Sequence, residues 1–274
     1  MISTINGLNI LIPFLYLIVF LIYTYDFFTE KNLFKNSKRI FLFITLFIHA
    51  FYLMIRTVEF DHPPITNKFE IFSLLAFSVS FSYFILELLT DIRATGSFIV
   101  LFSLIFQTIS SLSLENNYVV PEVLRNRMLG LHVVSAILGY SGFTISAVYG
   151  LLFLILYKNL RNNKFGLIFN RLPSLEILEK LSFYSVVIGF ALLSVAIVIG
   201  AIWLPEAFPN FSYFDPKLVG TAFVWLAYGT GIISKILAKW YGKKVIIFSL
   251  CGFLLTLISL IVTSTYSKTF HSFY

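Results

Sequence analysis

Four histidines are the side chains of this chain best suited to bind a metal ion. They are His49, His62, His132 and His271, and they are spread over the length of the sequence. A neutral imidazole offers one ring nitrogen with a lone pair, which makes histidine the commonest protein ligand for metals. Cys251 is the only cysteine, so disulfides, CxxC redox chemistry and thiolate metal sites within the chain are excluded. We expect Cys251 to be a small buried apolar side chain.

The composition is that of a membrane-spanning protein. Of the 274 residues, 58% are hydrophobic and 12% are charged, about half the charged fraction of a soluble domain. Apolar stretches of roughly 20 residues recur, and each is long enough to cross the hydrocarbon core of a bilayer. The 32 Phe and 15 Tyr fit lipid-facing and interfacial positions, and the net charge of +7 fits basic loops that set membrane topology. We therefore expect membrane lipid, and no nucleic acid, around the protein.

Eight apolar spans can be counted, and no linker is long enough to divide the chain into domains. The spans are expected at about residues 8–25, 40–58, 69–89, 97–114, 128–157, 181–204, 218–237 and 245–266. The fifth, of roughly 30 residues, is longer than a bilayer requires and should tilt or project. The sequence thus predicts an all-α, polytopic helix bundle that forms a single domain over residues 1–274.

Lysines and arginines are divided unevenly between the two sets of loops. One set holds 14 of them and the other holds six, so the positive-inside rule places both termini outside. His62, His132 and His271 then lie at the outer face, whereas His49 lies in the middle of the second span. A mid-span histidine is costly enough to require a partner or a function. Glu87, near one end of the third span, is expected to be a solvated or capping carboxylate.

His132 lies on a stripe of small and hydroxyl residues along the fifth span. The stripe comprises His132, Ser135, Gly139, Gly142, Ser146 and Gly150. Such stripes mark the face of a membrane helix that packs against other helices, so His132 should point into the bundle near the outer surface. Two interpretations stay open. The imidazole forms a hydrogen bond with a neighbouring backbone carbonyl, or it is offered to a metal or to haem iron.

The segment between the sixth and seventh spans is aromatic. It contains Phe208, Phe211, Tyr213 and Phe214 beside Pro205 and Pro209, a density that fits an interfacial belt or a cover for a flat apolar ligand. Asp215-Pro216 can start the seventh span as an N-cap and a first helical residue. Lys217 and Arg56 are basic groups of the outer face that could pair with carboxylates of such a ligand.

His271 follows the eighth span in an aromatic C-terminal tail. On its own this position is typical of a frayed terminus. The eighth span, however, carries its own small polar stripe of Ser249, Gly252, Thr256, Ser259 and Thr263, which predicts that this helix packs inside the bundle. Its exit would then deliver His271 near the centre of the outer face.

These residues resemble the cytochrome c assembly, or haem-handling, membrane proteins of the CcsA and CcmC type. The similarity covers roughly residues 56 to 274. The stretch from Ala201-Ile202-Trp203 to Phe214-Asp215-Pro216-Lys217 is similar to the family's outer tryptophan-rich loop. Residues 128–140 around His132 look like the family's first histidine helix, and Phe270-His271-Ser272-Phe273 looks like the second. Upstream, residues 62–70, which begin with His62, are similar to a further family stretch.

The sequence also departs from this family pattern. Most of the loop tryptophans are replaced, Leu218 stands where the family has a glutamate, and the family's histidine in the next span would fall near Ile233. His49 is a candidate substitute for that ligand. The pattern looks most similar to the HemX-like branch, which is associated with control of glutamyl-tRNA reductase.

The resemblance implies a haem-binding protein of cytochrome c biogenesis in the bacterial cytoplasmic membrane. It implies non-covalent haem b held by His132 and His271 as axial ligands of the iron. The surrounding residues would be Phe208, Phe211, Tyr213, Phe214, Asp215, Lys217, His62 and Arg56. We expect no catalytic residues, and at most an accessory part in a haem-attachment complex with a cytochrome c biogenesis partner protein. The alternatives are a HemX-like regulator of haem synthesis and a small-solute transporter without haem.

Overall fold

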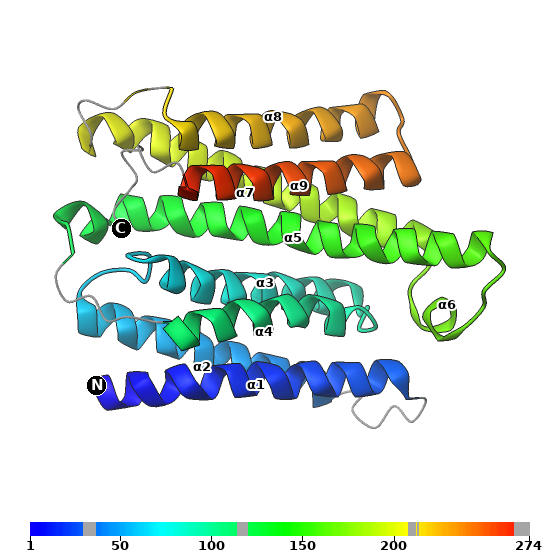
Figure 1. The fold of residues 1–274 in the computed structure, drawn as a ribbon, viewed down its shortest axis with the longest axis horizontal. Coiled ribbons are helices and arrows are strands. Elements are labelled where there is room, and N and C mark those ends of the chain that lie inside the picture. The colour runs from blue at the N-terminus through cyan, green and yellow to red at the C-terminus, as the bar shows by residue number, and fades with distance from the viewer. Residues whose placement is uncertain (30–36, 114–119, 208–211, 213, 266–274) are drawn as a thin grey trace. The chain divides into compact units, whose positions relative to one another are not determined.

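Every regular element in the described part of the chain is a helix. The computed structural model describes residues 1–29, 37–113, 120–207, 212 and 214–265. The helices are α1 (Ile2–Phe28), α2 (Ser37–Phe60), α3 (Lys68–Thr90), α4 (Gly96–Ser113), the 3₁₀ helix η1 (Glu122–Arg125), α5 (Arg127–Arg161), α6 (Leu167–Arg171), α7 (Leu175–Ala207), α8 (Pro216–Leu237) and α9 (Lys243–Thr265) (Figure 1). The predicted all-α class is confirmed.

Seven of these helices are long and apolar enough to cross a membrane. They are α1, α2, α3, α5, α7, α8 and α9, counted among the described residues. The fourth predicted span is the shorter helix α4, of 18 residues. Helix α5 has 35 residues, so the prediction that it exceeds a bilayer is confirmed. The chain is a multi-pass helical membrane protein.

The chain divides into two compact units, Met1–Gly130 and Leu131–Tyr274. In the first unit, which we call the N-terminal unit, α1 contacts α2 and α4, and α3 contacts α2 and α4. Helix α3 is capped at its N-terminus by Asn67, whose Oδ1 accepts a hydrogen bond of 2.8 Å from the backbone N–H of Glu70. The single domain over residues 1–274 stays a prediction.

Small residues bring helices together in the second unit, the C-terminal unit. A Cβ on Gly139 would lie 2.9 Å from the carbonyl oxygen of Gly189, and one on Gly142 would lie 2.8 Å from that of Ser185. Further along α5, Ser146 Oγ lies 2.9 Å from Ser182 Oγ of α7 and 2.8 Å from Ser249 Oγ of α9. The predicted packing stripe on the fifth span is therefore confirmed.

Other expectations for single residues had mixed outcomes. Asp215 caps α8 as predicted, with its Oδ1 accepting from the Lys217 N–H at 2.8 Å and Pro216 as the first helical residue. The expectation for Cys251 was wrong, because this side chain is exposed on α9. The expectation for Glu87 was also wrong. It is fully buried, accepting from Tyr23 Oη at 2.6 Å and pairing with Arg39, because an interior partner was available on α1 and another on α2.

Candidate functional site

His132 forms a hydrogen bond with the backbone of α7. Its Nδ1 lies 2.8 Å from the carbonyl oxygen of Ala196, and the residue is partly buried. A carbonyl oxygen can only accept, so Nδ1 must carry the hydrogen in this contact. The neutral imidazole then has its lone pair on Nε2, to which no other described residue donates a hydrogen bond.

Gly200, one turn further along α7, provides the space in which the ring lies. A Cβ on Gly200 would lie 2.9 Å from both Cε1 and Nδ1 of His132, closer than such atoms approach in proteins. The helix continues past this point and ends at Ala207, where the aromatic segment begins. The same helix thus holds the imidazole and leads into the segment that was predicted to cover a ligand.

This arrangement is the one found in metal-bound histidines. Their second ring nitrogen usually donates to a carbonyl or carboxylate, which fixes the tautomer and aims the other nitrogen at the metal. Within the described ranges no three His, Cys, Asp or Glu side chains gather to hold a metal ion. Haem iron needs only one or two protein ligands, because the porphyrin supplies the others. The geometry of His132 fits such an axial ligand.

The other predicted residues of the C-terminal unit are only partly described. Phe214 is 88% exposed, and its N–H lies 3.2 Å from Ser212 Oγ. Asp215 is buried at the start of α8, and Lys217 follows it in the first turn. Phe208, Phe211, Tyr213 and His271 lie outside the described residues, so their predicted roles stay predictions.

Arg56 takes part in a buried ion pair of the N-terminal unit. Its Nε and Nη2 donate to Glu70 Oε1 at 3.0 and 2.8 Å, and both side chains are almost fully buried. The second carboxylate oxygen of Glu70 accepts from the N–H and the hydroxyl of Thr66, each at 2.8 Å. Arg56 therefore fixes the turn between α2 and α3 by neutralising the carboxylate on which that turn is built.

His62 lies in the same turn, close to Arg56. Its Nδ1 lies 2.9 Å from the carbonyl oxygen of Pro63, and its ring centre lies 6.0 Å from that of Phe60. The guanidinium of Arg56 lies 4.7 Å from the centre of the same Phe60 ring. The structure thus brings two of the predicted residues, Arg56 and His62, together around Phe60.

His49, at the centre of α2, uses both ring nitrogens inside the N-terminal unit. Tyr16 Oη lies 3.0 Å from Nδ1, and Ser73 Oγ lies 3.0 Å from Nε2. Ser73 gives its hydroxyl hydrogen to Gln107 Oε1 at 3.0 Å, so it accepts from Nε2–H, and Nδ1 accepts from Tyr16. No nitrogen of His49 is then left for a cofactor. The expectation that this residue has a partner is confirmed.

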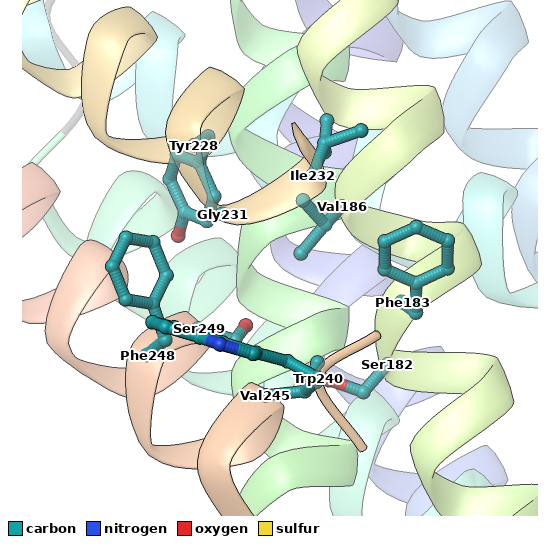
Figure 2. Close-up of a pocket in the computed structure, with 10 residues that line it drawn as sticks. All are labelled: Ser182, Phe183, Val186, Tyr228, Gly231, Ile232, Trp240, Val245, Phe248 and Ser249. Atoms are coloured by element: carbon teal, nitrogen blue, oxygen red, sulfur yellow. The ribbon is translucent and has the colours of Figure 1, made fainter. Parts of the chain in front are cut away.

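A separate small hollow lies in the C-terminal unit between α7, α8 and α9 (Figure 2). The rings of Phe183, Phe248 and Trp240 line it, and Ser182 and Ser249 form part of its wall (Figure 2). Both serine hydroxyls are already hydrogen-bonded to Ser146. None of the predicted cofactor residues lines this hollow, so it is distinct from the site around His132.

The interpretation that His132 forms a hydrogen bond with a backbone carbonyl is confirmed, and its binding of haem iron stays a prediction. The identities of its two partners, Ala196 and Gly200, were not predicted. Ala196 acts through its backbone, which residue type does not reveal, and the glycine at position 200 does not by itself indicate which side chain it meets. The register between α5 and α7 determines which α7 residues meet His132. That register depends on glycine contacts such as the one between Gly139 and Gly189, which a single sequence does not reveal.

Known proteins resemble this chain over most of its length. The sequence model of the family described as "Cytochrome C assembly protein" matches residues 65–271. The "Cytochrome c biogenesis protein CcsA" of Guillardia theta is 28% identical over 238 residues, covering 80% of this chain and 79% of the relative. The protein of that name from Mesostigma viride is 24% identical, and the alignment covers 90% of this chain and 88% of the relative. The one from Prochlorococcus marinus is 27% identical and covers 81% and 79%. The chain belongs to the cytochrome c assembly family of membrane proteins.

Proposed function

We propose that this protein binds non-covalent haem b at the outer membrane face and presents it to a partner in cytochrome c maturation. His132 and His271 are the two axial ligands in this proposal, and the membrane is the bacterial cytoplasmic membrane. The observation that carries the proposal is the hydrogen bond from His132 Nδ1 to the Ala196 carbonyl. It supports a tautomer with a basic Nε2, the form in which histidine binds iron.

Each residue of the proposed site has a distinct task. Ala196 orients the imidazole of His132, and Gly200 provides the space that the ring occupies. Phe208, Phe211, Tyr213 and Phe214 exclude water from the macrocycle. Bound haem would supply the iron porphyrin that is transferred to an apocytochrome.

Basic groups would hold the propionates of the haem. We assign this task first to Lys217, because Arg56 already neutralises Glu70. Arg56 and His62 contribute by shaping the turn between α2 and α3. Asp215 fixes the start of α8 and so places Lys217.

Absorption and electron paramagnetic resonance spectra of the purified full-length protein test the ligand assignment. We expect a six-coordinate, low-spin haem in the wild type. His132→Ala and His271→Ala should each abolish or change that spectrum. His49→Phe is the matched control, because both nitrogens of His49 have partners, and it should keep the wild-type spectrum. An unchanged spectrum in both ligand variants would refute the assignment.

A HemX-like regulator of haem synthesis is the second candidate. It is favoured by Ile233, which stands where the family's further histidine is expected and lies on the exposed side of α8. A deletion strain separates the two candidates. Loss of c-type cytochromes with normal tetrapyrrole levels supports assembly, whereas raised glutamyl-tRNA reductase with normal cytochromes supports regulation.

A further inference from the structure

The connection between α5 and α7 is an exposed, basic and apolar hairpin that the proposed haem site does not use. It comprises residues 158–173 and contains the short helix α6. In Figure 1 it leaves the end of α5 as an open loop of the C-terminal unit. We call this segment the α6 hairpin.

The hairpin begins at a turn that is set by the chain itself. Helix α5 ends in a Schellman motif, in which Lys164 N–H donates to Asn159 O at 2.9 Å and Asn163 N–H donates to Leu160 O at 3.1 Å. Asn163 adopts the left-handed conformation that this motif requires, with φ of 51°. At the other end, Leu172 is buried and Pro173 precedes α7. The segment is thus a defined structure that is fixed at both ends.

Apolar side chains of the hairpin face outward. Phe165 is 56% exposed, Leu167 39% and Ile168 36%, and no residue of α6 is buried. The rings of Phe165 and Phe169 meet edge to face with their centres 5.0 Å apart, so they form one aromatic pair. Such an apolar cluster at the end of membrane helices matches the residues that enter the acyl boundary of a bilayer.

The charge of the hairpin has one sign. Residues 158–173 contain Lys158, Arg161, Lys164 and Arg171 and no carboxylate. Lys158, Arg161 and Lys164 form no ion pair with any described residue. The nearest acidic residues in sequence are used elsewhere, because Glu176 pairs with Lys180 and Glu179 pairs with Lys235. Lys158, Arg161 and Lys164, three cations that no carboxylate of the described residues pairs with, complement an anionic surface.

We propose that the α6 hairpin anchors the C-terminal unit to anionic phospholipid headgroups, with its apolar side chains in the acyl boundary. The topology predicted from the Lys and Arg count places the hairpin on the inner leaflet, whose negative surface attracts basic segments. The membrane-spanning helices on either side of the hairpin, α5 and α7, keep it close to that surface. This anchor is independent of haem binding.

Spin labels on the full-length chain test the anchor. Cys251→Ser removes the single cysteine, and Ile168→Cys or Asn162→Cys then gives one labelled position on α6 or on the polar turn. The protein is placed in nanodiscs of phosphatidylcholine alone or with phosphatidylglycerol. We expect the label at 168 to collide with oxygen more than with a water-soluble nickel chelate when phosphatidylglycerol is present. The label at 162 should show the reverse.

Charge variants separate lipid recognition from simple hydrophobic contact. Arg161→Gln and Lys164→Gln should each weaken the phosphatidylglycerol dependence by about five-fold. Lys239→Gln, in the turn between α8 and α9, and Lys244→Gln, in the first turn of α9, are the matched controls and should leave the label at 168 unchanged. Equal immersion in both lipids would overturn recognition of anionic headgroups. A label at 168 that stays exposed to nickel in both lipids, or is shielded only by an added soluble protein, would overturn the anchor itself.

Discussion

A histidine in each of the two compact units differs in how its ring nitrogens are hydrogen-bonded. In the N-terminal unit, His49 is fully buried and hydrogen-bonded through both nitrogens, to Tyr16 and Ser73. In the C-terminal unit, His132 is hydrogen-bonded through Nδ1 to Ala196, and Nε2 receives no hydrogen bond from the described residues. A histidine with two partners completes a structure, whereas a histidine oriented by one partner can bind a ligand.

The interiors of the two units also differ in the contacts that hold their helices together. The N-terminal unit buries ion pairs, among them Arg56 with Glu70 and Lys38 with Asp26. The C-terminal unit is held by glycine contacts, serine hydroxyls and aromatic stacking, such as Phe143 on Tyr228 with ring centres 3.7 Å apart. Buried charge in the N-terminal unit is compensated internally. The following predictions test this contrast, from the largest expected effect to the smallest.

The largest effect is expected from breaking the Arg56–Glu70 pair. Glu70→Leu leaves a buried, uncompensated guanidinium and should lower the free energy of unfolding by about 3–5 kcal/mol. Denaturant unfolding in detergent measures this change. The double variant Arg56→Met with Glu70→Leu should recover most of the loss. Asp61→Asn breaks the exposed pair with Arg125 and should cost less than about 1 kcal/mol. Equal losses for Glu70→Leu and Asp61→Asn would contradict the claim that the N-terminal unit depends on internal compensation of its buried charge.

A smaller loss is expected when His49 is replaced by phenylalanine. The substitution leaves the buried hydroxyls of Tyr16 and Ser73 without their imidazole partner, which should cost about 2 kcal/mol. Haem content should not change, because His49 offers no nitrogen to a ligand. A His49→Phe protein that unfolds like the wild type but loses haem would reverse the assignment of the two histidines.

Gly200→Ala should affect haem more than stability. The added methyl group would meet the His132 ring at 2.9 Å and turn it away from its present orientation. We expect a stability loss of about 1 kcal/mol and a shifted or partly high-spin haem spectrum. Gly166→Ala is the control, because a Cβ there meets no atom within 4 Å. A wild-type spectrum in Gly200→Ala would show that the orientation of His132 does not matter for the iron.

The smallest effect concerns pH and the end of α3. Hydrogen bonds from Arg93 and Arg39 hold the pKa of Asp91 below its usual range. Because the folded pKa is the lower one, the stabilisation is present above about pH 4 and is lost as pH falls through the folded value. The melting temperatures of wild type and Asp91→Asn should therefore differ slightly at neutral pH and converge in acid. A difference that grows in acid would contradict this sign.

The sequence was sufficient to predict the elements of the fold and much of their packing. Apolar spans of bilayer length predicted all of the long helices, and the small residues around Gly139 and Gly142 predicted the contact face of α5. The Asp215 cap was also predictable, because it depends only on neighbours in sequence. Glu87 and Cys251 were not predicted correctly. Their burial is decided by the rotation of α3 and α9, to which strongly apolar helices give little sequence signal.

The candidate site was predictable only in its residue types. His132 could be identified from its stripe of small residues. Its tautomer, however, depends on the backbone carbonyl of Ala196, and the position of a backbone carbonyl cannot be deduced from the residue types. Arg56 was predicted to pair with a ligand carboxylate, which stays a prediction, and its pair with Glu70 was not predicted. The Arg56–Glu70 pair lies at the turn between α2 and α3. Its geometry depends on the capping of α3 by Asn67 and on the approach of Thr66 to the carboxylate.

The central claim is that His132, and not His49, offers a nitrogen to haem iron, and chemical rescue tests it most directly. His132→Gly and His49→Gly are purified as full-length proteins and titrated with haem, with and without free imidazole. The account predicts that only His132→Gly loses the six-coordinate low-spin spectrum and that imidazole restores it. A low-spin spectrum in His132→Gly without imidazole, or its loss in His49→Gly with rescue by imidazole, would contradict the account.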